Sequence, residues 1–242
     1  MYKGKRVSVV MPAYNEEPGI GATVQGFKEH PFVDEVIVAD NNSTDETAAI
    51  AERAGARVVP EKRQGYGFAC QTALRNATGD LIVLTESDNS FYPDDMELLF
   101  AYVPHFDIVK GARSNRNLIG DGADWTFALM IGNWLLSKYM QILYFGSNSL
   151  EDVAMREVGG TFRVIKREAL EKIMPYVTEG QAAFLPDMIT IALRLNLKII
   201  EIPVRYRRRL GVSKYTGNRI KATLLAFRML GIITRNRFKR LN

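Results

Sequence analysis

The chain has 242 residues, is 47% hydrophobic and 24% charged, and carries a formal net charge of +5. This size and composition fit one globular domain with a large core. A single cysteine, Cys70, excludes a disulfide framework and fits a reducing compartment. Two histidines without any Cys–His spacing argue against zinc, and no uninterrupted apolar run is long enough to span a membrane.

Apolar runs alternate with stretches of helical period through the first 115 residues. The pattern predicts strands at 7–11, 34–39, 56–59, 80–84 and 106–111, and helices near 17–29, 44–54, 66–77 and 93–103. Such alternation with short connections indicates a mostly parallel sheet with helices on both faces. Ser43, followed three residues later by Glu46, fits a capping box at the start of the second helix.

The pattern changes after residue 115. There we expect a long apolar helix near 124–145, a strand at 159–165, and helices near 167–174 and 182–196. A last strand at 197–207, a loop at 208–218 and a final helix at 219–234 follow. The sequence contains no internal repeat and no low-complexity linker. The economical interpretation is one α/β domain with amphipathic helices in its C-terminal half.

Polar residues gather where the predicted strands end. The segments are PAYNE (12–16), ADNNSTD (39–45), TESDNS (85–90) and GAR (111–113). Ligands of parallel sheets bind outside the carboxyl ends of the strands. The clustering therefore predicts an active site at one edge of the sheet.

Two acids one residue apart, Glu86 and Asp88, follow the fourth predicted strand. A hard divalent cation such as Mg²⁺ or Mn²⁺ takes few carboxylates and completes its shell with waters and substrate phosphates. It would neutralise a diphosphate and make it a better leaving group. The alternative is that the two acids simply mark a loop and a helix start.

Four segments in order resemble a family 2 glycosyltransferase of the GT-A fold: VSVVMPAYNEE, VIVADNNSTDET, GYGFACQTALRNATGD and the acid pair. The element RLGVSK at 209–214 is similar to the Arg-x-Gly-x-Ser-Lys element of the dolichyl- or polyprenyl-phosphate sugar synthases, the group typified by dolichyl-phosphate mannose synthase. The resemblance implies an inverting, metal-dependent hexosyltransferase that moves a sugar from a UDP- or GDP-linked donor to a polyprenyl phosphate. It also implies a GT-A domain over 1–217, with a nucleotide-binding half (1–115) and an acceptor half (116–217), followed by a basic amphipathic helix (218–242).

The same resemblance assigns residues to the nucleotide-sugar pocket. These are Pro12, Tyr14, Glu16, Asp40, Asn42, Gly65 and Asp152. Gly65 and Gly67 would let the backbone turn beside the nucleotide, or they merely open a helix. Asn42 and Ser43 have an alternative role as a turn and a helix cap.

The metal, the catalytic centre and the acceptor phosphate are assigned in the same way. The resemblance gives Glu86, Asp88 and Ser90 to the metal; Asp88, Asp187 and Arg209 to catalysis; and Arg113, Arg209, Ser213 and Lys214 to the acceptor phosphate. A phosphomonoester is already nucleophilic at neutral pH, so it needs a cationic cradle rather than a general base.

Two departures from the family pattern leave questions open. Glu86 stands where relatives carry Asp, so it reaches the metal directly or through water. The segment DWTFALMIGN lacks the Arg and Ser of many relatives, so Arg116 substitutes or the acceptor differs. Asp187, where relatives commonly have Glu, would help order the RLGVSK loop; Asp152 and Asp187 are alternatively buried partners of arginines.

Two other functions remain as alternatives. One is transfer to a saccharide hydroxyl, which would require a general base, with Asp187 or Asp152 as the candidates. The other is a nucleotide-sugar-binding protein without transfer activity. Nucleic acid is not an expected partner, because the basic tail lacks a recognition motif.

The helix at 126–145 has a polar stripe of Asn133, Ser137 and Gln141 on an apolar and aromatic body. In the final helix Lys221, Arg228 and Arg235 recur every seven residues, which suggests stems that snorkel towards lipid phosphates. We therefore expect a peripheral protein at the cytoplasmic face of a membrane, with a small membrane partner or a homo-oligomer as further options. The alternative is that both helices pack on the sheet.

Overall fold

The structure is a computed structural model that describes residues 1–123, 127–146, 155–211 and 219–241. Its strands are β1 (Val7–Ala13), β2 (Glu35–Asp40), β3 (Arg57–Pro60), β4 (Leu81–Leu84), β5 (Ile108–Ala112), β6 (Arg163–Lys166) and β7 (Ile199–Pro203). Its helices are α1 (Glu17–Lys28), α2 (Thr47–Arg53), α3 (Tyr66–Asn76), α4 (Asp95–Tyr102), the 3₁₀ helix η1 (Arg116–Leu118), α5 (Phe127–Leu143), α6 (Arg167–Ile173), α7 (Phe184–Arg194) and α8 (Arg219–Phe238).

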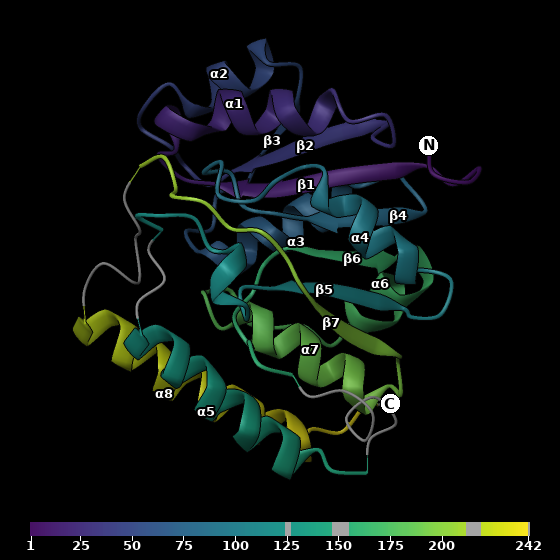
Figure 1. The fold of residues 1–242 in the computed structure, drawn as a ribbon, viewed down its shortest axis with the longest axis vertical. Coiled ribbons are helices and arrows are strands. Elements are labelled where there is room, and N and C mark those ends of the chain that lie inside the picture. The colour runs from purple at the N-terminus through teal and green to yellow at the C-terminus, as the bar shows by residue number, and fades with distance from the viewer. Residues whose placement is uncertain (124–126, 147–154, 212–218, 242) are drawn as a thin grey trace.

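The strands form one sheet in the order β3-β2-β1-β4-β6-β5-β7. β6 runs antiparallel to β4 and β5, and the other neighbouring strands are parallel. Alternation along β1 sends Val9 and Val10 to opposite faces, and each face has its own apolar core. Helices α1, α2 and α4 cover one face, whereas α3, α6 and α7 cover the other (Figure 1). The predicted mostly parallel sheet is confirmed.

Local packing moves several predicted boundaries. Helix α2 begins at Thr47, because the Asp45 carboxylate accepts a hydrogen bond from the Thr47 backbone N–H (3.1 Å). The Ser43 hydroxyl instead accepts one from the Asn15 N–H (3.0 Å), so the predicted capping box is wrong. The last strand ends at Pro203, four residues earlier than the predicted end at 207.

The segment after β7 follows a different path from the sheet. Its backbone N–H groups bond to residues of other segments: Tyr206 to the carbonyl of Leu118, Arg207 to that of Ser90, and Leu210 to that of Asp88. The chain is thereby held along the loop that follows β4. This is the feature of the fold that brings the basic segment to the acid pair.

Helices α5 and α8 lie side by side outside α7, away from the sheet (Figure 1). The Tyr144 hydroxyl donates to the Ile233 carbonyl (2.9 Å), and the Tyr139 and Thr234 hydroxyls are 2.7 Å apart. In α5, Ser137 is fully buried and Asn133 accepts from the Gly159 N–H (3.3 Å), so the polar stripe faces the protein.

The outer surface of these two helices is apolar. Its exposed large side chains are Met130, Ile131, Trp134, Leu135, Ile142, Ile220, Leu224, Phe227 and Leu230, which we call the α5–α8 apolar face. Within the described part of the chain, no helix combines the length and apolar character needed to cross a bilayer.

Candidate active site

The chain turns sharply after β1, β2 and β4, and an asparagine makes each turn. Asn15, Asn42 and Asn89 have left-handed φ angles of 50°, 61° and 63°, a conformation that Asn tolerates better than most residues. The Asn42 side chain also donates to the Lys62 carbonyl (3.1 Å). These turns hold the residues that follow the strands at the carboxyl edge of the sheet.

The acid pair lies at this edge, Asp88 buried and Glu86 half-buried, and one serine lies between the two carboxylates. Asp88 is 1% exposed, and its Oδ1 accepts hydrogen bonds from the Ser90 hydroxyl (2.5 Å) and the Ser90 N–H (3.1 Å). The Ser90 hydroxyl lies 3.5 Å from Glu86 Oε2. The three residues assigned to a metal by resemblance therefore lie together.

Arg209 lies between the acid pair and a third carboxylate, that of Glu16. Its guanidinium Nη2 lies 2.9 Å from Asp88 Oδ2 and 3.5 Å from Glu16 Oε1, and the side chain is only 15% exposed. Asp88 Oδ2 is a buried atom that accepts no hydrogen bond among the described residues, so the guanidinium is its electrostatic partner. Three separate segments, after β1, β4 and β7, thus meet at one point.

The donor set fits a hard divalent cation. Within the described ranges, no three His, Cys, Asp or Glu side chains are grouped so that they hold a metal ion by themselves. Mg²⁺ and Mn²⁺ sites of phosphate-transferring enzymes use one or two carboxylates and take further ligands from substrate phosphates. Asp88, whose Oδ2 accepts no hydrogen bond among the described residues, and Glu86 would supply such carboxylates.

Glu86 is held by a hydroxyl chain that the sequence analysis missed. The Thr161 hydroxyl donates to Glu86 Oε1 (2.9 Å), and the Tyr66 hydroxyl lies 2.9 Å from the Thr161 hydroxyl. Because Thr161 has one hydroxyl proton and gives it to the carboxylate, Tyr66 donates to Thr161. Thr161 precedes β6, and because β6 is antiparallel, its start lies at the carboxyl edge of β4.

Burial raises the pKa of Glu86 to about 7, and the neighbouring charge of Asp88 acts in the same direction. Arg113 and Arg209 oppose the rise through their positive charges. The free carboxyl pair is thus an electrostatically unfavourable arrangement that a further cation would relieve.

Arg113 lies at the same edge, but it is paired with an acid that the sequence analysis did not single out. Its Nε donates to Glu157 Oε1 (2.8 Å), its backbone N–H donates to Glu157 Oε2 (2.7 Å), and its guanidinium stacks on Tyr206 (4.8 Å to the ring centroid). These contacts hold Arg113, a residue predicted to bind the acceptor phosphate, in one position at the edge of the sheet.

The remaining predicted donor residues lie around the first two strand ends. Pro12 is buried in β1, Tyr14 is 38% exposed, and Asp40 ends β2 with a buried Oδ1 that has no hydrogen-bond partner among the described residues. Asp152, Ser213 and Lys214 lie outside the described residues.

Gly65 and Gly67 open α3 and also pack against a loop from the other half of the chain. The Gly65 N–H donates to Asn41 Oδ1 (2.7 Å). A Cβ on Gly67 would lie 2.5 Å from the Glu179 carbonyl oxygen, and the Phe68 N–H donates to the Gly180 carbonyl (3.1 Å). The glycines therefore allow the 178–181 loop to approach the start of α3.

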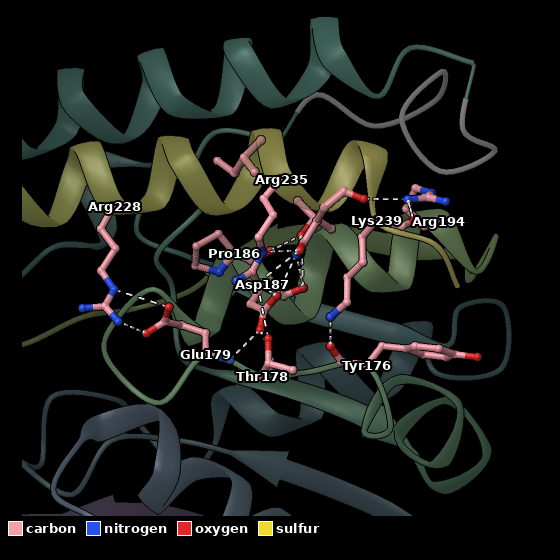
Figure 2. A network of polar contacts seen from close by, with 12 residues as sticks. Tyr176, Thr178, Glu179, Pro186, Asp187, Arg194, Arg228, Arg235 and Lys239 are labelled. Carbon is pink, nitrogen blue, oxygen red and sulfur yellow. Dashed lines mark hydrogen bonds and ion pairs between the residues drawn. The ribbon is translucent and has the colours of Figure 1, made fainter. Parts of the chain in front are cut away.

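Asp187 is fully buried in α7 and connects that loop to α8 (Figure 2). Its Oδ2 accepts from the N–H groups of Thr178 (3.0 Å) and Glu179 (2.9 Å). Its Oδ1 accepts from Asn236 Nδ2 (2.7 Å) and lies 3.4 Å from Arg235. The described contacts of Asp187 are therefore with the 178–181 loop and α8.

Two arginines of α8 turn towards the protein. Arg228 pairs with Glu179 (2.8 Å) and Arg235 with Asp187 (3.4 Å), as Figure 2 shows. The expectation that both snorkel towards lipid is wrong, because two buried carboxylates of the same chain engage them. The side chain of Lys221 lies outside what the structure describes.

Comparison with known proteins gives consistent matches. The model of the family described as glycosyl transferase family 2 matches residues 8–174. An uncharacterised glycosyltransferase of Mycobacterium tuberculosis is 28% identical over 92% of this chain and 95% of its own length. A dolichyl-phosphate hexose transferase of Haloferax volcanii is 30% identical over 86% of this chain and 86% of its own length.

A solved structure shares the fold. Glucosyl-3-phosphoglycerate synthase from Mycobacterium tuberculosis, in complex with Mn²⁺, UDP and phosphoglyceric acid, has a TM-score of 0.72 at 20% identity. The match covers 99% of this chain and 81% of that chain. The expected GT-A architecture is thereby confirmed.

The raised pKa of Glu86 predicts a pH-dependent stability of the metal-free protein. The pKa rises from 4.5 to about 7 on folding, so the stability from this group is full below pH 4.5 and is lost as the pH rises through 7. Glu86→Gln cannot ionise, so we expect its Tm in EDTA to exceed that of wild type by several degrees more at about pH 8 than at about pH 5. The exposed Glu52→Gln is the matched control, and parallel Tm–pH curves for wild type and Glu86→Gln would count against the pKa assignment.

The contacts of Asp187 predict a large loss of stability on its removal. Asp187→Ala leaves two backbone N–H groups and the Asn236 amide without this acceptor. The free energy of unfolding, measured in urea, should therefore fall by about 3–5 kcal/mol. Asp121→Ala, at an exposed position, should change little. An Asp187→Ala protein with wild-type unfolding free energy and no turnover would show instead that the residue acts in catalysis.

Proposed function

Because this chain belongs to glycosyl transferase family 2, we propose that it is an inverting, metal-dependent hexosyltransferase that transfers a sugar from a nucleoside-diphosphate donor to a polyprenyl phosphate. The observation that carries the proposal is the meeting of Asp88, Glu16 and Arg209 at the carboxyl edge of the sheet. There a buried carboxylate oxygen, which could bind a metal ion, lies beside a cation, which could bind a phosphate group.

The donor side is supplied by the ends of β1, β2 and β4. Asp40 Oδ1 is a buried acceptor available to a ribose hydroxyl or a base N–H, and Pro12, Tyr14 and Asn42 would line the same pocket. Asp88, assisted by Ser90 and Glu86, would hold Mg²⁺ or Mn²⁺, which when bound neutralises the leaving diphosphate. The solved neighbour bound to Mn²⁺ and UDP supports this kind of donor.

The acceptor side is cationic. Arg209 with Ser213 and Lys214 of the RLGVSK element, and Arg113 at the same edge, would orient an anionic acceptor. A phosphate oxygen of the acceptor attacks the anomeric carbon from the face opposite the diphosphate, which inverts that centre. The 30% identical dolichyl-phosphate hexose transferase supports a lipid phosphate as this acceptor.

Transfer to a saccharide hydroxyl would require a general base. Of the two candidates, Asp187 has both carboxylate oxygens engaged by Thr178, Glu179 and Asn236, so it is poorly placed to accept a proton. A phosphate acceptor requires no such base, which favours the lipid phosphate.

We place the acceptor's membrane at the α5–α8 apolar face. Phe227 is 69% exposed and Leu224 is 64% exposed on α8, beside Trp134 and Leu135 on α5. An apolar surface of this size is an interaction site rather than ordinary solvent-facing surface. The exposed Trp134 fits the interfacial region of a bilayer, which supports peripheral binding; the cytoplasmic face is part of the proposal.

The acceptor assignment is tested with labelled UDP- and GDP-hexoses, Mn²⁺ or Mg²⁺, and a panel of acceptors: a short polyprenyl phosphate, 3-phosphoglycerate and a free saccharide. We expect label in the lipid phosphate. Asp88→Asn should lower the rate roughly 100-fold or more, since it removes the carboxylate charge that would hold the metal ion against the leaving diphosphate. Asp94→Asn, with a side chain that is 79% exposed, should retain the rate. Label only in the saccharide or in 3-phosphoglycerate would overturn the lipid acceptor.

The membrane assignment predicts a specific loss on polar substitution. Leu224→Ser with Phe227→Ser should reduce co-sedimentation with anionic phospholipid vesicles by roughly 10-fold or more, because two exposed apolar side chains no longer enter the interface. Leu98→Ser, 49% exposed on α4 on the opposite face of the sheet, is the control and should not change it. Equal vesicle binding by all three proteins would contradict the assignment.

A further inference from the structure

Arg209 lies where a cation bound to Asp88 would also have to lie. Its Nη2 is 2.9 Å from Asp88 Oδ2, the buried oxygen that accepts no hydrogen bond among the described residues. A metal ion bound to that oxygen would approach to about 2.0–2.2 Å and carry a shell of further ligands. A guanidinium in its present position takes up one side of that oxygen and would repel a hydrated divalent ion bound to the other.

The backbone around Arg209 is fixed on both sides. The Leu210 N–H donates to the Asp88 carbonyl (2.9 Å), and the Arg207 N–H donates to the Ser90 carbonyl (2.9 Å). Any departure of the guanidinium from Asp88 is therefore a rotation of the side chain rather than a movement of this segment. Glu16 lies 3.5 Å from the guanidinium, so a second carboxylate is also close to it.

The guanidinium is charged at every pH at which the protein is folded. It neutralises part of the negative charge of the buried Glu16 and Asp88 and of the half-buried Glu86. A divalent ion entering this cluster gains its attraction to the carboxylates but must first break the contact between Arg209 and Asp88. The contact therefore reduces the affinity of the free protein for metal.

We propose that Arg209 is a resident counter-ion that competes with the divalent metal for Asp88, and that the donor diphosphate relieves this competition by taking up the guanidinium. The inference rests on the proposed function, moves Arg209 from the acceptor phosphate to the donor diphosphate, and adds a binding order. The free protein binds metal weakly; metal and nucleotide bind tightly together, because the diphosphate coordinates the metal and gives Arg209 an anionic partner in place of Asp88.

The test is a titration with Mn²⁺ followed by the electron paramagnetic resonance signal of the free ion, with and without UDP or GDP. Removing the competitor with Arg209→Met should tighten Mn²⁺ binding to the nucleotide-free protein by roughly 5- to 100-fold, the usual range for coupled sites. The same variant should lose much of the additional affinity that the nucleotide confers on wild type. Arg208→Met, at the exposed neighbouring position, should behave as wild type.

Arg209→Lys is a second variant in case the methionine protein does not fold, and thermal unfolding of each variant establishes that it does. Lysine keeps the charge but loses the forked geometry, so we expect an intermediate tightening. Mn²⁺ affinity that is unchanged or weaker in both Arg209 variants, without nucleotide, would overturn the competition.

Asp88→Asn separates this result from the proposed function. If it abolishes Mn²⁺ binding while the Arg209 variants bind as wild type, the metal site stands and the competition is refuted. If wild type binds no Mn²⁺ even with nucleotide, the metal-dependent function and the competition fail together.

Discussion

Carboxylates buried at one edge of the sheet require positive charge or hydrogen-bond donors close by, and much of the structure around them meets that requirement. Glu16, Glu86 and Asp88 come from the ends of β1 and β4, where the parallel strands deliver them to the same place. Ser90 of the same β4 loop, and Thr161 and Arg209 from two other segments, supply hydrogen bonds and positive charge to them. The chain after β7 forms backbone hydrogen bonds to the β4 loop, and these bonds place Arg209 next to the acids.

A second buried acidic pair connects the outer helices to the same region. Glu179 and Asp187 engage Arg228, Arg235 and Asn236 on α8 (Figure 2). The loop that they hold packs against Gly65 and Gly67 at the start of α3, next to the predicted donor pocket. Arg228 and Arg235 of α8 pair with carboxylates of the protein, while Ile220, Leu224, Phe227 and Leu230 of the same helix are exposed, which is the reverse of an ordinary surface helix. The ion pairs of α8 thus hold the helix against the protein, and the apolar side chains that remain exposed on it form part of the proposed membrane contact.

Much of this architecture follows from sequence periodicity. Alternating apolar runs and helical stretches predict the parallel strands, and polar strand ends predict the edge of the sheet at which Asp40, Glu86 and Asp88 lie. Turn chemistry was less predictable: Ser43 and Glu46 match a capping box, but the Asp45 side chain forms the local bond that starts α2. The sequence pattern alone does not show whether Ser43 or Asp45 forms the hydrogen bond at the start of this helix.

Partners across long sequence distances were not predictable from motifs. Thr161 reaches Glu86 because β6 is antiparallel, so its first residues share an edge with the last residues of β4. The longer side chain of Glu86 is held by that hydroxyl, which accounts for a glutamate at this position in the acid pair. The pairing of Glu157 with Arg113 could not be predicted from the sequence for the same reason, since it depends on the strand order.

The most direct measurement is anomalous diffraction from crystals soaked with Mn²⁺ and a nucleoside diphosphate. We expect one manganese peak in direct contact with the Asp88 carboxylate and with diphosphate oxygens, with the nucleoside extending towards Asp40. A manganese peak elsewhere, or a diphosphate bound away from Asp88, would contradict a donor site at the carboxyl edge of this sheet.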